Sequence, residues 1–107
     1  MRKDLIQSEI DRILSIAASD SSVVRVFVFG SACALEQVHD ESDLDVCIVQ
    51  RTELKFFDRL AAWIDRIEPH IGVDLVVYTP EEFDDLRHSN YFVRVEIEAK
   101  GELIYAA

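Results

Sequence analysis

Apolar residues recur along this chain with two different periods, and the periods separate helices from strands. Residues 3–18 and 53–68 place apolar side chains three and four positions apart, which predicts helices with one apolar face. Trp63 falls one position off that face and is expected at the edge of the core. Apolar runs at residues 23–29 and 44–49, each broken by one charged residue (Arg25 and Asp45), predict buried strands.

The second half of the chain also contains both predicted strands and predicted helices. Residues 72–78 predict a third strand, and Thr79-Pro80-Glu81-Glu82 predicts a helix start in which Thr79 and Glu82 form a capping box. Residues 91–99 predict a further helix, and Gly101 is expected to end it before a short strand at residues 103–105.

This order of elements predicts an α+β fold, because two strands follow each other without an intervening long helix. We expect a small mixed β-sheet with helices packed on one face and acidic side chains on the other. No repeat, linker or low-complexity tract interrupts the sequence, so residues 1–107 are expected to form a single domain.

Three aspartates interrupt the apolar strands. Asp43 and Asp45 flank Leu44 at the entrance of the second strand, so both point to the same face. Asp74 is the one acid in the third strand, and it joins them if the two strands are neighbours. Two carboxylates about 5 Å apart repel by roughly 3 kcal/mol at an effective dielectric near 20. Such a cluster favours hard divalent cations, and two magnesium ions at one site are an established device of phosphoryl chemistry.

The first strand ends in Gly30-Ser31, whose backbone N–H groups and hydroxyl suit a phosphate. Taken alone, this pair is an ordinary strand-ending turn. Residues 32–37 are expected to add one helical turn with its amino end toward the phosphates. Aspartates are also common in loops, and the convergence of three of them is what separates a site from a set of turn residues.

The net charge of −10, from 21 acidic and 11 basic residues, argues against general nucleic-acid binding. It suits a basic protein partner or simply a well-solvated surface. Cys33 and Cys47 have neither metal nor redox spacing, and Cys47 is expected in the core. With no signal-peptide pattern and no run long enough to cross a bilayer, we expect a cytoplasmic protein without membrane contact.

Two motifs together carry a family resemblance. Val28-Phe29-Gly30-Ser31, followed after eleven residues by Asp43-Leu44-Asp45-Val46, resembles the G-S-x-D-x-D signature of polymerase-beta-like nucleotidyltransferases. With the strand Val73-Asp74-Leu75-Val76 and the ending Ala99-Lys100-Gly101-Glu102-Leu103-Ile104-Tyr105, the chain resembles the minimal nucleotidyltransferase (MNT) group.

The resemblance implies that Gly30 and Ser31 hold the triphosphate of ATP, while Asp43, Asp45 and Asp74 bind two Mg²⁺ ions. Asp74 would also help to deprotonate an acceptor hydroxyl, which then takes AMP as pyrophosphate leaves. In minimal family members the acceptor is often a tyrosine on a HEPN-domain protein, a toxin that the MNT protein silences as antitoxin by AMPylation.

One departure keeps a second interpretation open. The family commonly has arginine and glycine soon after the serine, where this chain reads Ala32-Cys33-Ala34-Leu35. Arg51, Lys55 and Arg87 are the candidates to replace the missing cation. The alternative is a catalytically inactive, antitoxin-like module that neutralises its partner stoichiometrically. In either case the acceptor or partner is expected on another chain, and self-association is left open.

Overall fold

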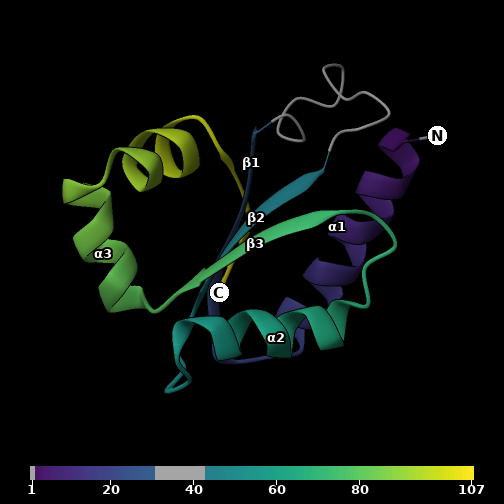
Figure 1. Cartoon of the computed structure of the whole chain (residues 1–107), viewed down its shortest axis with the longest axis horizontal. Helices are drawn as coiled ribbons and strands as arrows, with labels where there is room; N and C mark the ends of the chain where they lie inside the picture. The colour runs from purple at the N-terminus through teal and green to yellow at the C-terminus, as the bar shows by residue number, and fades with distance from the viewer. Residues whose placement is uncertain (1, 31–42) are drawn as a thin grey trace.

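Four strands form one mixed sheet in the order β3-β2-β1-β4. The computed structural model describes residues 2–30 and 43–107. The strands are β1 (Val23–Phe29), β2 (Leu44–Gln50), β3 (Val73–Tyr78) and β4 (Glu102–Ala106). β1 is antiparallel to both β2 and β4, whereas β2 and β3 run parallel (Figure 1). The predicted strands and the mixed sheet are therefore confirmed.

The helices are α1 (Arg2–Ala18), α2 (Phe56–Ile67), α3 (Pro80–Ser89) and the π-helical segment η3 (Phe92–Ala99). The sequence predicted a helix at η3 but not its π form, in which the Lys100 N–H donates to Val95 O at 2.9 Å. Within residues 2–30 and 43–107, no helix is both long and apolar enough to cross a membrane.

The predicted capping box of α3 is confirmed. Thr79 Oγ1 accepts from the Glu82 N–H at 3.1 Å, and Glu82 Oε1 accepts from the Thr79 N–H at 2.8 Å. The same Glu82 oxygen accepts from Arg59 Nη1 at 2.7 Å, and Arg59 also donates to Val77 O at 3.1 Å. Through these hydrogen bonds Arg59 links α2 to the end of β3 and to the start of α3.

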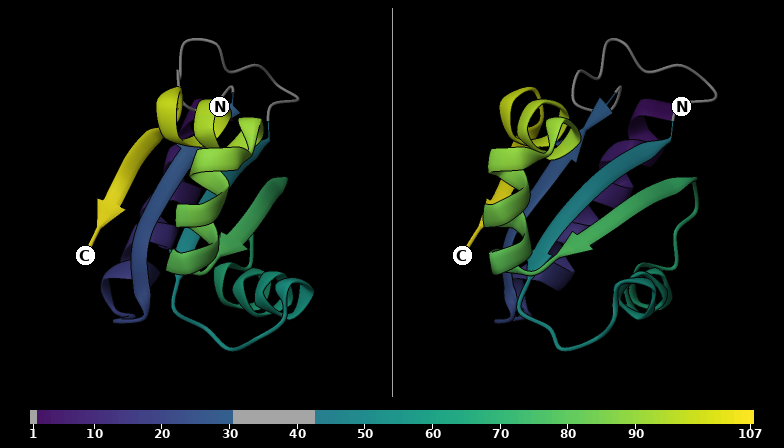
Figure 2. Two further views of the ribbon diagram at one scale, coloured as in Figure 1. Left: turned by 90° about the vertical axis from the view of Figure 1, so that its left-hand side faces the viewer. Right: turned by 60° about the vertical axis from the view of Figure 1, so that its left-hand side comes forward.

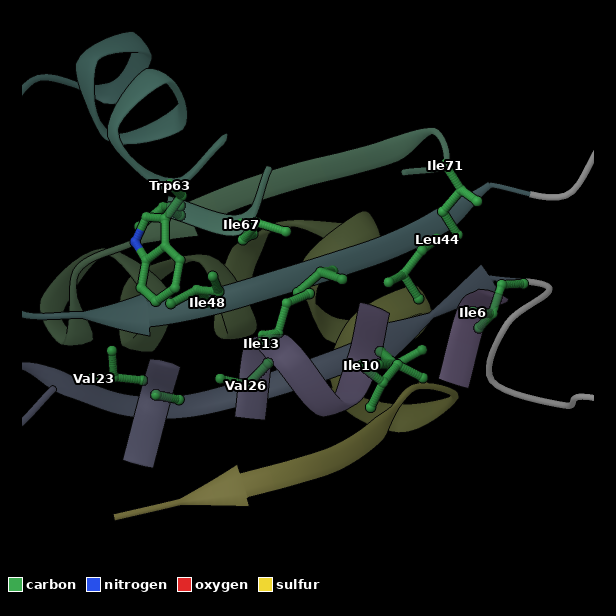
Figure 3. Packing of buried hydrophobic residues seen from close by; sticks show 14 residues of the cluster. Ile6, Ile10, Ile13, Val23, Val26, Leu44, Ile48, Trp63, Ile67 and Ile71 are labelled. Atoms are coloured by element: carbon green, nitrogen blue, oxygen red, sulfur yellow. The ribbon is translucent and has the colours of Figure 1, made fainter. Parts of the chain in front are cut away.

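One face of the sheet packs against α1 and α2. Figure 3 shows Trp63 of α2 beside Ile48 of β2, and Ile13 of α1 lies near the same strand. Trp63 is 1% exposed, so the expectation of a peripheral tryptophan is wrong. Its indole N–H donates to Gln50 Oε1 at 2.8 Å, and this hydrogen bond allows the ring to be buried.

The opposite face is covered as well, by α3 and η3 (Figure 2). Phe83 of α3 stacks on Phe27 of β1 with ring centroids 5.4 Å apart, and Val93 and Ile97 of η3 are buried in the same cluster. The prediction that helices pack on one face only is thus corrected to helices on both faces. The cause is the strands themselves, because Phe27, Cys47 and their neighbours on this face are apolar and need cover.

We predict that Phe83→Ala lowers the free energy of unfolding by about 3 kcal/mol, because it empties a fully buried site. Phe57→Ala is the matched control, since the Phe57 ring is 78% exposed and its loss leaves no cavity. Urea unfolding of both variants measures the difference. Equal effects would show that α3 does not depend on Phe83 for its packing.

Candidate active site

The parallel register of β2 and β3 brings the three predicted acids together. Asp45 pairs with Asp74 across the two strands, and the Leu44 N–H donates to Gly72 O at 2.9 Å at their start. Asp43 lies one residue before β2 and on the same side as Asp45. Because β1 ends where β2 and β3 begin, Gly30 reaches the same end of the sheet (Figure 1).

The pKa of Asp45 is raised by burial and also because the other two acids lie close to it. Burial raises the pKa of Asp45 first, the charge of Asp74 and a hydrogen bond between the two carboxyl groups raise it further, and the charge of Asp43 adds to them. Together they move it from 3.8 to about 6. Asp43 and Asp74 are exposed, whereas Asp45 is partly covered.

Two glycines line this cluster. Gly30 has a φ of +69°, which disfavours any side chain, and a Cβ there would overlap Asp45 Oδ2. A Cβ on Gly72 would overlap Asp43 Oδ1. Glycine at both positions therefore lets the backbone approach the carboxyl groups. Gly72 was not predicted to belong to the site, although its place at the start of the predicted strand 72–78, two residues before Asp74, was a usable signal.

Several predicted residues lie outside the described part of the chain. Ser31, the proposed phosphate contact, is among them, together with Cys33 and the expected helical turn at residues 32–37. Cys47 is described and fully buried, as expected, and burial raises the pKa of its thiol to about 12. This thiol is therefore a core group rather than a nucleophile.

The three candidate cations do not gather at the acids. Arg51 and Lys55 follow β2 at its far end, roughly 20 Å from its start at about 3.3 Å per residue. Arg87 is engaged elsewhere, since its Nε donates to Glu98 Oε2 at 2.6 Å.

The donor chemistry of the cluster fits a divalent cation. Carboxylate oxygens are the ligands that Mg²⁺ prefers, and a cation would offset the repulsion that raises the pKa of Asp45. Within the described residues no three acidic, histidine or cysteine side chains are already arranged as a ligand set. Asp45 and Asp74 instead share a hydrogen bond, so an ion that binds between them would displace the proton that the two carboxyl groups share.

Comparison with known proteins places the chain in a family. Residues 11–107 match the family described as polymerase beta, nucleotidyltransferase, so the chain belongs to the polymerase beta nucleotidyltransferase family. The α+β fold agrees with that membership. No match is found among curated proteins.

Two solved structures share the fold. One is a Sulfolobus solfataricus protein provisionally described as a nucleotidyltransferase, with 22% identity and a TM-score of 0.59 over 95% of this chain and 86% of that one. The other is a toxin–antitoxin structure with AMP-PNP, with 18% identity and a TM-score of 0.56 over 91% of this chain and 73% of that one.

We predict that Asp45→Asn stabilises the metal-free protein at neutral pH. Because the fold raises the pKa of Asp45 to about 6, ionisation opposes folding, and this cost is absent below about pH 4 and complete above about pH 7. Solvent screening of the partly exposed carboxyl limits the expected gain to about 1 kcal/mol. Urea unfolding with a chelator, at the two ends of that range, measures it. A gain of the same size at both ends would contradict the assignment.

Proposed function

We propose that this protein is a magnesium-dependent nucleotidyltransferase that moves AMP from ATP to a hydroxyl group of a partner protein. One observation carries the proposal: the β2–β3 register sets Asp45 beside Asp74, with Asp43 close enough to raise the pKa of Asp45 further. Three carboxyl groups held together at a strand end, next to a glycine turn, are well suited to cations and phosphates.

Each acid then has a role. Asp43 and Asp45 would hold two Mg²⁺ ions against the triphosphate, and the backbone of Gly30, which lies against Asp45, would contact the phosphates at the same end of the sheet. Bound magnesium would neutralise phosphate charge as pyrophosphate leaves. Asp74 would orient the acceptor hydroxyl and accept its proton. The hydroxyl oxygen would then form a bond to the α-phosphorus of ATP, as the bond between the α-phosphorus and the oxygen bridging to the β-phosphate breaks.

The acceptor is proposed to be a protein. A net charge of −10 disfavours RNA or DNA and favours a basic surface. The fold shared with a toxin–antitoxin structure that contains AMP-PNP supports a toxin as partner and an adenine nucleotide as donor. The resemblance to MNT proteins specifies a HEPN-domain toxin, with this chain as its antitoxin.

A second candidate function is neutralisation by binding alone. The observation that favours it is an exposed apolar surface, made by Leu54 and Phe57, which are 48% and 78% exposed. Phe57 meets Phe56 edge to face, and Phe56 with Tyr78 lines a hollow of about 360 Å³. This surface lies at the opposite end of β2 and β3 from the acids, so a partner bound there need not be modified.

The catalytic proposal predicts that the HEPN-domain partner gains one or more AMP units when it is incubated with this protein, ATP and Mg²⁺. Asp43→Ala and Asp45→Ala should abolish that gain, because each removes cation ligands, while the complex of the two proteins stays intact. Intact-protein mass spectrometry and gel filtration measure the two results. Asp84→Ala, a change of an exposed acid on α3, is the control and should leave the modification unchanged.

The binding alternative predicts a different pattern. Phe57→Ser should weaken the complex about tenfold, since burying a phenylalanine ring contributes roughly 1.5–3 kcal/mol. Leu103→Ser, at a 48% exposed residue of β4, is the matched control and should bind as the wild type does. If neutralisation survives Asp43→Ala and Asp45→Ala without any mass gain, but needs about tenfold more protein in Phe57→Ser, the binding function replaces the catalytic one.

A further inference from the structure

Glu9 is a buried acid that the proposed chemistry does not use. Its exposed fraction is 1%, and it lies on the face of α1 that also buries Ile6, Ile10 and Ile13. A carboxylate among such neighbours is costly unless its oxygens are hydrogen-bonded. The partners of Glu9 therefore show what this residue holds in place.

Those partners belong to α1 and to the loop between α2 and β3. Both carboxylate oxygens of Glu9 accept from Arg12 Nη2 at 2.7 Å, and Oε1 also accepts from the His70 backbone N–H at 2.9 Å. Arg12 Nη2 donates in addition to Glu68 O at 3.2 Å. Glu68 ends α2 with a φ of 48°, so the chain turns sharply at this point. Glu9 and Arg12 thus hold the loop through two backbone groups.

The held loop leads directly to the acids. Ile71 is 9% exposed and lies beside Leu44 of β2 (Figure 3). Gly72 accepts from the Leu44 N–H at 2.9 Å and lies against the carboxyl group of Asp43. Asp74 follows two residues later. The position of the loop therefore sets where β3, and Asp74 as its second residue, begins, and how closely Gly72 approaches Asp43.

We propose that Glu9 is a positioning residue for the metal site: through His70 and Arg12 it sets the loop so that Asp43, Asp45 and Asp74 converge. This inference rests on the proposed function, because it assumes that the three acids bind Mg²⁺. The neutral glutamine is a poor substitute, because either orientation of its amide turns the –NH₂ group toward a donor. That donor is Arg12 Nη2 if the amide oxygen takes the place of Oε1, and includes the His70 N–H if the oxygen takes the place of Oε2.

Asp20→Asn is the matched control for Glu9→Gln. Both changes replace a carboxylate by the corresponding amide and break an ion pair to arginine. Asp20 Oδ2 accepts from Arg66 Nη1 at 2.8 Å, which joins α2 to the turn after α1. That turn precedes β1, at the end of the sheet away from the acids (Figure 1). A general loss of rigidity would therefore affect both variants, whereas a positioning role affects Glu9→Gln alone.

The experiment titrates Mg²⁺ alone into the full chain by isothermal calorimetry. We expect Glu9→Gln to weaken Mg²⁺ binding about tenfold, as loss of a supporting contact around a metal site does, and Asp20→Asn to change it less than about twofold. Hydrogen exchange should show faster exchange of the His70 amide in Glu9→Gln only. Should Glu9→Gln not fold, Arg12→Lys is tested in its place, because lysine keeps the charge but lacks the guanidinium group, whose Nη2 donates both to Glu9 and to Glu68 O.

The outcomes are distinguishable. Equal Mg²⁺ affinity in wild type and Glu9→Gln, or equal weakening in Glu9→Gln and Asp20→Asn, would overturn the positioning role while leaving the proposed function intact. If the wild type itself binds no Mg²⁺, the proposed function fails and this inference fails with it.

Discussion

Parallel pairing of β2 with β3 fixes two carboxyl groups beside each other, because the register sets Asp45 opposite Asp74. Asp43 adds its charge to the same place, and partial burial and these neighbours raise the pKa of Asp45. A fold that holds like charges together gives up stability locally, and it regains that stability when a cation binds. The rest of the molecule must therefore hold β2 and β3 in this register against the repulsion between the acids.

The hydrophobic clusters on both faces of the sheet hold this register. Leu44 is fully buried against the α1–α2 layer, while Cys47 and Val49 are fully buried against the α3–η3 layer. A slip of β2 by one residue would exchange its two faces and bury Asp45 among the isoleucines of α1. Packing on both sides thus specifies which face carries the acids, and the Glu9–Arg12 contacts add a local support where β3 begins.

Much of this could be predicted from the sequence, because strand runs, helix periods and the capping box at Thr79 are local signals. The convergence of the aspartates followed from side-chain alternation and one assumption, that two strands are neighbours. Contacts between residues far apart in the sequence were not predictable. Trp63 can be buried because Gln50 accepts its N–H, and the second face is covered because α3 and η3 fold back onto it. Glu9 carried a sequence signal, an acid between Ile6 and Ile10 on an apolar helix face, but its partner at His70 is 61 residues away.

The most direct test of the account is a crystal structure of the protein grown with Mn²⁺ and a non-hydrolysable ATP analogue, with manganese located by its anomalous scattering. We expect manganese bound by carboxylate oxygens of Asp43, Asp45 and Asp74, with the triphosphate beside Gly30. Manganese absent from this end of the sheet, or the Asp74 carboxylate directed to the opposite face, would contradict it.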